Sequence, residues 1–256
     1  MNLIFLHHSC DGQLFAGPGT DHGTNCLYSS QPNGGGLRAL LEQSGYHGHE
    51  AGYGWRTGHA THIFDWLPKF RTQMVDVLHC DQQGVRYADA RPNQVVMFKS
   101  CYPNNGFVSA GTPPENPAGP ELPVSNAKAA DTALLHEFRK CPNVLFVCVT
   151  APPLAPKSPL QPFWKQLARK VFDRAHTLVL SGPMERNFNH WLSDANGWLQ
   201  GYPLPQVAVF DYYVILTGDG ASDFSVYPTG DGYDSHPNRA FVPFLNQAVR
   251  RVCLAD

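Results

Sequence analysis

The feature of this sequence that most restricts its fold is a series of short apolar runs, separated from one another by helical patterns. The runs are rich in β-branched and aromatic residues, and they are apolar throughout instead of alternating. That pattern is typical of parallel strands covered on both faces. The runs are Leu3–Leu6, Val95–Phe98, Val144–Val149 and Val207–Ile215, with a weaker candidate at His49–Tyr53.

Between these runs, apolar residues recur at the spacing of an amphipathic helix. The clearest such segment runs from Phe241 to Val252, and others begin near Ile63, Ser125, Phe163 and Phe188. Pro68 predicts a kink or a late start of its helix, and Ser125 or Asn126 is expected to cap the next one. Alternating strands and helices predict an α/β fold: a three-layer α/β/α sandwich around a mostly parallel five-stranded sheet.

Length and composition favour a single domain over residues 1–256, because no composition shift or internal repeat divides the chain. The net charge is −2, and no cluster of Lys or Arg stands out. This argues against nucleic acid as a partner, since phosphate binding needs clustered cations. No apolar run reaches the roughly 18 residues of a membrane span. The first residues lack the charged start of a signal peptide. We therefore expect a soluble protein, either cytoplasmic or exported after processing of a longer precursor.

Cysteine and histidine patterns bear on metal binding. The seven cysteines include no Cys-x-x-Cys pair, which argues against a structural zinc site. The twelve histidines include His47-x-His49 and His59-x-x-His62, which His7-His8 could join. A histidine-cluster metal-dependent hydrolase is therefore one alternative, although no His-Glu-x-x-His spacing occurs. Our expectation is that the protein uses no metal and no cofactor.

Long loops rich in Gly, Pro, Ser and Asp follow several of the expected strands. Loops of more than about 12–15 residues are uncommon in compact domains and often serve a function. Because each follows a strand, each should emerge at the carboxyl edge of the sheet, where open α/β folds bind ligands. The loops are Ala16–Gly36, Gly106–Val124 and Gly218–Pro237.

A nucleophile and its base can be proposed from the two ends of the chain. Ser9 lies just after the first expected strand, where a hydroxyl would be exposed at the edge of the sheet. A serine hydroxyl needs a base within hydrogen-bond reach. His236 can serve, because Asp234 lies two residues earlier and in an extended segment projects to the same side. The carboxylate would fix the imidazole tautomer and leave the other ring nitrogen free to take a proton.

Donors for a developing oxyanion are expected after the strand Val95–Phe98. Ser100, Asn104 and Asn105 follow that strand, and a side-chain donor can stabilise the negative charge that develops on a carbonyl oxygen. The backbone N–H of Gly54 (or Gly52) is a second candidate, since glycine lets a substrate approach closely. Trp55, Tyr102 and Asn105 are expected to contact the substrate.

In their order along the chain, these residues resemble the four sequence blocks of the SGNH (GDSL-like) hydrolase superfamily. The blocks of that family supply a serine after the first strand, a glycine, an asparagine and a C-terminal Asp/His pair. The chain is most similar to a bacterial subgroup with His-His-Ser in place of Gly-Asp-Ser. It shares with that subgroup Asp65-Trp66, Phe98–Pro103 and Val209–Asp211. The resemblance implies a flavodoxin-like sheet and a serine esterase that needs no metal.

Three departures from the usual family pattern stand out. Gly-Asp-Ser is absent, the third block lacks Gly-x-Asn-Asp, and Asp234-x-His236 has one spacer residue where two are usual. A one-residue spacer also occurs in related carbohydrate O-acetyltransferases. The resemblance thus predicts hydrolysis of a short-acyl carboxylic ester, such as an acetyl group on a carbohydrate. The alternatives are an O-acetyltransferase, a carbohydrate-binding protein without turnover, and a thiol nucleophile at Cys10. The oligomeric state is left open.

Overall fold

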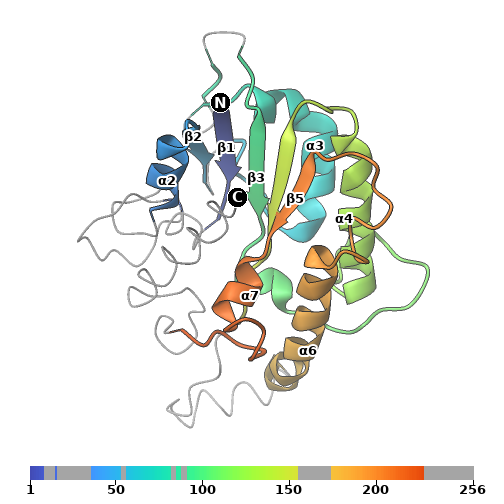
Figure 1. The fold of residues 1–256 in the computed structure, drawn as a ribbon. Coiled ribbons are helices and arrows are strands. Elements are labelled where there is room, and N and C mark those ends of the chain that lie inside the picture. The colour runs from blue at the N-terminus through green and yellow to red at the C-terminus, as the bar shows by residue number, and fades with distance from the viewer. Residues whose placement is uncertain are drawn as a thin grey trace.

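The structure, a computed structural model, describes residues 1–8, 15, 36–52, 56–81, 85–87, 91–154 and 174–227. Its centre is a sheet of five parallel strands in the order β2-β1-β3-β4-β5 (Figure 1). The strands are β1 (Asn2–Leu6), β2 (His47–Ala51), β3 (Val95–Lys99), β4 (Leu145–Val149) and β5 (Val207–Phe210). The expected five-stranded parallel sheet is therefore confirmed, including the weaker strand near His49.

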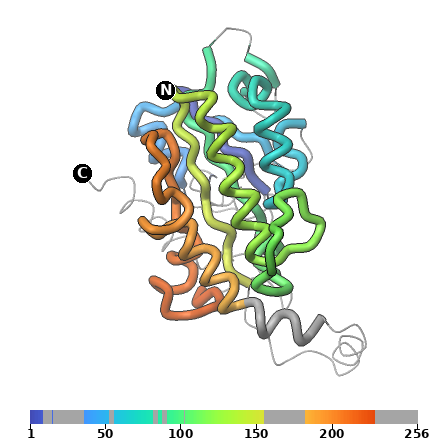
Figure 2. Tube along the Cα trace, turned by 90° about the vertical axis from the view of Figure 1, so that its right-hand side faces the viewer, coloured from blue at the N-terminus to red at the C-terminus, as the bar shows by residue number. Residues whose placement is uncertain are grey.

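Helices cover both faces of the sheet. On one face lie α3 (Ile63–Leu78), α4 (Val124–Phe138) and α6 (Arg174–Ser193), seen from their own side in Figure 2. The other face carries α2 (Leu37–Gln43) and α7 (Tyr212–Leu216). A short 3₁₀ helix, η2 (Tyr102–Asn105), follows β3. The described helices thus form the outer layers of the expected α/β/α sandwich.

An aromatic cluster fills the core between β3, β4 and the helices α3 and α4. Phe138 stacks on Phe146 with ring centroids 4.1 Å apart. Phe70 meets both of these rings and Phe98 edge to face. Each such pair contributes about 0.5–1.5 kcal/mol beyond its buried area. Because Phe98 lies near the end of β3, this packing holds the carboxyl edge of the strand in place.

The fourth apolar run, Val207–Ile215, was expected to be one strand, and this prediction is wrong. The strand ends at Phe210, and α7 begins at Tyr212. Asp211 separates the two elements, because its carboxylate accepts hydrogen bonds from the Val214 backbone N–H (3.0 Å) and the Thr150 hydroxyl (3.2 Å). A side-chain cap of this kind stabilises a helix start. An apolar run alone cannot distinguish a buried strand from a buried helix.

The start of α4 also differs from expectation. The residue before the helix is Pro123, and no side chain caps it. The Asn126 side chain accepts instead from the backbone N–H of Asn116 at 2.7 Å, which folds the preceding loop onto the helix. In α3, Pro68 lies inside the helix, and the backbone departs from helical angles at Gln73.

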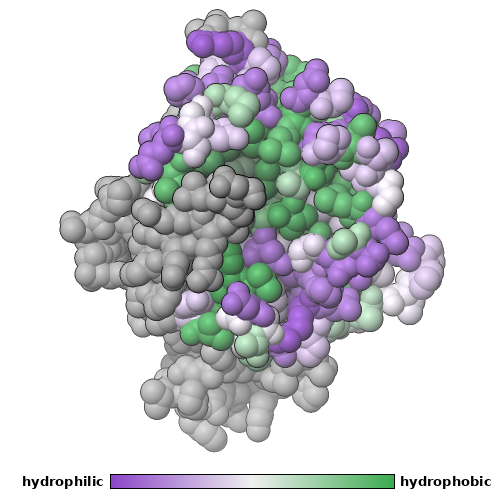
Figure 3. Space-filling view, in the orientation of Figure 1, coloured by the Kyte–Doolittle hydropathy of each residue, from purple (hydrophilic) through white to green (hydrophobic). Residues whose placement is uncertain are grey.

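The face of the sheet that carries α2 shows an apolar depression of about 280 Å³, part of the green surface in Figure 3. It is lined by side chains of α2 and the strands, among them Leu40, Met97 and Val147. The helices expected near Phe163 and from Phe241 to Val252 lie outside the described residues. Among the helices that are described, none combines the length and hydropathy needed to cross a bilayer.

Candidate functional site

The carboxyl edge of the sheet brings together the start of the Ser9 segment and the residues that follow β3. β1 and β3 are hydrogen-bonded neighbours, with Leu6 opposite Phe98. The strand order reverses at β1, which has β2 on one side and β3 on the other. A reversal of this kind opens a crevice outside the carboxyl ends of the strands.

Several residues expected in the site lie outside the described part of the chain. They are Ser9, Gly54, Trp55, Asp234 and His236. For Tyr102 the backbone is described, as the first residue of η2, but its side chain is not. Ser100, Asn104, Asn105 and Gly52 are described, and their positions can be compared with the roles expected of them.

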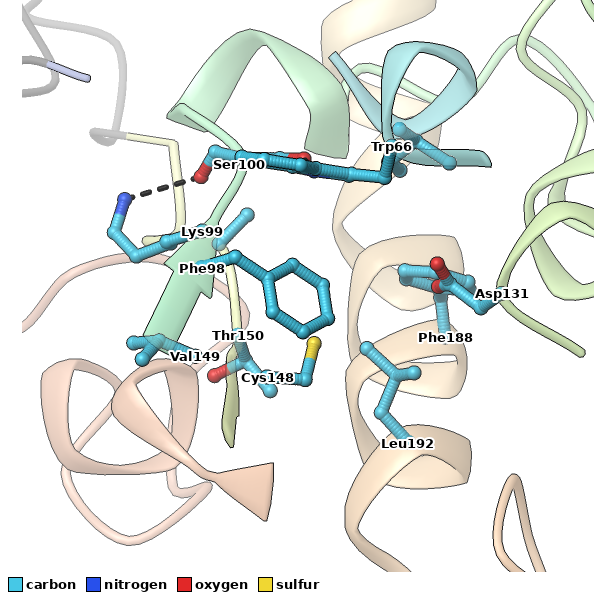
Figure 4. A pocket seen from close by; sticks show the side chains of 12 residues that line it. Trp66, Phe98, Lys99, Ser100, Asp131, Cys148, Val149, Thr150, Phe188 and Leu192 are labelled. Atoms are coloured by element: carbon cyan, nitrogen blue, oxygen red, sulfur yellow. Dashed lines mark hydrogen bonds between the residues drawn. The ribbon is translucent and has the colours of Figure 1, made fainter. Parts of the chain in front are cut away.

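Ser100 is the first residue after β3, and its hydroxyl oxygen accepts one hydrogen bond. The indole Nε1–H of Trp66 donates to the Ser100 oxygen at 2.8 Å, and the Lys99 ammonium donates to the Ser100 carbonyl at 3.0 Å. Figure 4 shows Trp66 lying beside Ser100, and Lys99 and Phe98 on opposite sides of the strand. The hydroxyl hydrogen is donated to no group in the described part of the chain. Ser100 therefore keeps a donor at this edge.

Asn104 connects η2 to the start of α3. Its carbonyl oxygen accepts from the Ile63 backbone N–H at 2.9 Å. Its amide nitrogen donates to the Cys101 carbonyl at 3.2 Å and lies 3.3 Å from the His62 ring nitrogen Nδ1. The carboxamide is buried, and its nitrogen and oxygen each have partners within the protein.

Asn105 connects the same loop to β4 and α6. Its amide nitrogen donates to the carbonyls of Ala151 (3.1 Å) and Pro152 (2.8 Å), and its oxygen accepts from Asn189 at 3.0 Å. The residue is fully buried. Both amide hydrogens are donated within the protein, so the buried side chain connects η2, the segment after β4 and α6.

A small cavity of about 20 Å³ lies beneath Ser100, between the sheet and the helices (Figure 4). Its wall is mostly apolar, with Phe188 and Leu192 from α6 and Cys148 from β4. This is room for about one water molecule. Cys148 is a buried free thiol, and burial raises its pKa well above the ordinary value.

Asp131 of α4 also lines this cavity. The residue is buried, and desolvation raises the pKa of Asp131 to about 8. A carboxyl group in such surroundings is protonated at neutral pH. The sequence offered one indirect signal, an acidic residue on the apolar face of the expected helix.

Buried lysines hold the loops around the site, and the sequence analysis did not single them out. Lys69 of α3 donates to the carbonyls of Thr57 (2.9 Å) and His59 (2.6 Å). Burial lowers the pKa of Lys69 to about 8, against the attraction of Asp65. Lys99 is fully buried and fixes the turn at Ser100. For both Lys69 and Lys99, the sequence feature that could have indicated burial is a lysine within an apolar pattern.

The loop held by Lys69 packs closely on the end of β2. A Cβ atom on Gly58 would lie 2.2 Å from the carbonyl oxygen of Gly52 and 2.4 Å from that of Ala51. Only glycine allows two backbones to approach so closely. This contact fixes where the chain leaves β2, next to the segment that contains Gly54.

A second polar cluster surrounds the end of β1. His7 is fully buried, and its Nε2 lies 2.9 Å from a carboxylate oxygen of Glu50 on β2. Arg38 of α2 contacts the other Glu50 oxygen at 3.2 Å. Burial lowers the pKa of Arg38, and Glu50 opposes that shift. The ring nitrogen Nδ1 of His7 is buried and has no hydrogen-bond partner among the described residues. The sequence analysis considered His7 only as a potential metal ligand.

Several of the histidines proposed for a metal site have other partners. His49 pairs with Asp81 at 2.6 Å, and His62 contacts Asn104. His8 lies 3.3 Å from the Thr61 hydroxyl. Within the described residues, no group of three or more His, Cys, Asp or Glu side chains is arranged to hold a metal ion.

The long loop between η2 and α4 is folded back on itself. Val108 donates to the Leu122 carbonyl at 3.1 Å, and Val124 donates to the Ser109 carbonyl at 3.0 Å. Gly119 packs against the Phe64 ring at the start of α3. The loop therefore forms a wall beside α3.

No protein-family model matches the chain, and no curated protein matches it. Among solved structures, it is similar to a family two carbohydrate esterase from Clostridium thermocellum in complex with cellohexaose. That match has 14% identity and a TM-score of 0.42, and it covers 99% of this chain and 62% of that one. A proposed acylhydrolase from Bacteroides fragilis matches with 11% identity and a TM-score of 0.42, covering 98% and 88%. The chain thus spans less than two thirds of the length of the esterase, and likeness at this level carries no argument about activity.

Proposed function

We propose that the protein is a serine ester hydrolase of the SGNH type that cleaves short-acyl carboxylic esters. Ser9 is the nucleophile, His236 the general base and Asp234 the residue that orients the imidazole. The observation that carries this proposal is the sheet order, in which β1 and β3 are neighbours at the point where the order reverses. Ser9 follows one of these strands and Ser100 the other, so both belong to the edge where open parallel sheets bind ligands.

The chemistry needs no group beyond these side chains. The Ser9 oxygen attacks the ester carbonyl while His236 takes the hydroxyl proton, giving a tetrahedral intermediate. His236 then gives that proton to the leaving alcohol, and the acyl group stays on Ser9. Water attacks the acyl-enzyme with His236 again acting as base, which releases the acid and restores the serine.

The oxyanion needs donors that are not already in use, and Ser100 supports this role best among the three side chains considered. The amide hydrogens of Asn104 and Asn105 have partners within the protein, whereas the Ser100 hydroxyl accepts from Trp66 and keeps its own hydrogen. We assign the side-chain donor to Ser100, beside the backbone N–H of Gly54. Asn105 then acts as a structural tie and does not contact the substrate.

Replacing Ser100 with alanine is expected to lower kcat about 10²-fold with little change in KM, because one oxyanion donor is lost. Steady-state hydrolysis of p-nitrophenyl acetate measures both constants. Ser44→Ala, which removes an exposed hydroxyl at the end of α2, serves as the control. An unchanged kcat in Ser100→Ala would return the donor role to Asn104.

The preference for a short acyl group rests on the resemblance to the SGNH hydrolases. Two experiments together test the proposed function. A fluorophosphonate probe should label the protein on Ser9, as located by peptide mass spectrometry. Turnover should fall from p-nitrophenyl acetate through butyrate to octanoate, with acetate also released from an O-acetylated oligosaccharide. A protein that takes no label and cleaves none of these esters would be a binding protein.

A further inference from the structure

The sequence blocks Asp65-Trp66 and Phe98–Pro103 are distant in the chain but meet in the structure. Trp66 lies in the first turn of α3, and its indole N–H donates to the Ser100 hydroxyl at 2.8 Å. On the same helix, the Ile63 backbone N–H donates to the Asn104 side chain at 2.9 Å. The start of α3 and the segment after β3 are therefore connected at two points, and one of them is the hydroxyl that we assign to the oxyanion.

The packing around Trp66 restricts the direction of its indole N–H. The residue is buried, and its ring stacks on Phe70 with centroids 6.0 Å apart and meets Phe98 edge to face at 5.2 Å. The Lys69 ammonium lies 4.8 Å from the ring centre, where the face of an aromatic ring attracts a cation. These contacts limit rotation of the ring, so the N–H is held towards Ser100 (Figure 4).

The indole N–H limits where the Ser100 hydroxyl can place its own hydrogen. A hydroxyl has one hydrogen and two lone pairs, and an indole N–H can only donate. One lone pair of the Ser100 oxygen therefore faces Trp66, and the hydroxyl hydrogen must take another staggered position. The Lys99 ammonium, which donates to the Ser100 carbonyl at 3.0 Å, fixes the backbone of the same residue. Both hydrogen bonds are buried, and burial strengthens a hydrogen bond relative to water.

We propose that Trp66 is a positioning residue for the oxyanion hole: its indole N–H holds the Ser100 hydroxyl so that the hydroxyl hydrogen is directed to the substrate at the carboxyl edge of the sheet. Trp66 acts through Ser100 and not on the substrate directly. This inference rests on the proposed function, in which Ser100 is the side-chain oxyanion donor. A donor that is already oriented needs no reorganisation as negative charge develops, so the indole N–H should affect kcat more than KM.

NMR of protein labelled with ¹⁵N-tryptophan tests the hydrogen bond without any turnover. The indole resonance of Trp66 is assigned by its loss in Trp66→Phe. In Ser100→Ala the indole proton of Trp66 should shift upfield, because it loses its acceptor. The resonance of Trp198, whose indole N–H donates to the Asp131 carbonyl at 2.8 Å, should stay where it is. A Trp66 resonance that is the same in wild type and Ser100→Ala would overturn the proposal.

A double-mutant cycle tests the positioning role. Trp66→Phe should lower kcat about 10-fold with KM little changed, a smaller loss than in Ser100→Ala because the hydroxyl remains but is no longer held. In the Ser100→Ala background, Trp66→Phe should cost nothing further in kcat per folded molecule, since there is no hydroxyl left to orient. If the two losses instead multiply in the double variant, Trp66 supports only the fold and the proposal is wrong.

Two further variants separate the indole N–H from the bulk of the ring. Benzothienylalanine at position 66 keeps the bicyclic ring and replaces only the N–H by sulfur, so it should lose kcat as Trp66→Phe does; a wild-type kcat would overturn the proposal. Trp198→Phe removes a buried indole hydrogen bond of the same length and should keep the wild-type kcat per folded molecule. Full activity in Ser9→Ala would contradict the proposed function and the positioning role with it, while the Trp66 resonance would still report the hydrogen bond.

Discussion

Ser9→Ala is expected to lose at least about 10³-fold in kcat/KM toward p-nitrophenyl acetate, approaching the uncatalysed rate. Without the hydroxyl no acyl-enzyme forms, and the remaining groups of a serine hydrolase triad have no nucleophile to activate. Initial rates of wild type and variant at equal concentrations of folded protein measure the loss. The far-ultraviolet circular dichroism of the two proteins should agree.

The control for this experiment is Ser44→Ala, which should keep the wild-type rate because Ser44 lies at the end of α2, away from the carboxyl edge. Substantial turnover by Ser9→Ala would contradict the assignment. Iodoacetamide would then distinguish a thiol nucleophile at Cys10, which it blocks, from a metal-dependent reaction, which a chelator would stop.

Asp131→Asn is expected to stabilise the protein against unfolding, and the gain should grow as the pH rises. The native carboxyl group holds its proton up to about pH 8, whereas in the unfolded chain it releases it near its ordinary pKa of 3.8. Between these values the native state binds more protons, so its stability falls with rising pH. Asparagine has no proton to release and removes this dependence.

The size of the expected gain in stability follows from the pH interval between the unfolded and native pKa values of Asp131. Each pH unit corresponds to about 1.4 kcal/mol, so the free energy of unfolding of Asp131→Asn should gain roughly 4 kcal/mol on wild type between pH 5 and pH 8. Urea denaturation at the two pH values measures this difference, and comparison across pH cancels any packing cost of the amide. Glu115→Gln, at an exposed carboxylate, should show no such gain. Equal differences at both pH values would mean that native Asp131 is ionised at neutral pH.

The hydrogen bonds of Asn105 show why the residues of the site were harder to predict than the sheet. Asn104 was expected to donate to the oxyanion and Asn105 to contact the substrate, because both follow a strand. Asn105 is instead buried by Asn189 of α6, which lies 84 residues further along the chain. A single sequence does not reveal such a pairing. An asparagine that binds a substrate therefore cannot be distinguished in the sequence from one that stabilises the fold.

His7 and Glu50 give a similar case. His7 follows a short apolar run and Glu50 lies in a polar stretch, and nothing in their spacing relates them. They meet because β1 and β2 are adjacent and in register, with Phe5 opposite Glu50. The neighbouring strand thus makes His7 one member of a buried pair with Glu50.

The sequence by itself determined the class of the fold, and it predicted the edge of the sheet at which we propose the chemistry. Strand and helix periodicity is local, since it depends on which side of a segment meets the core. The tertiary structure alone decided which side chains at that edge are free to act. Hydrogen-bond partners and desolvation depend on residues distant in the chain, as Ser100 with Trp66, Asn105 with Asn189 and the buried Asp131 show.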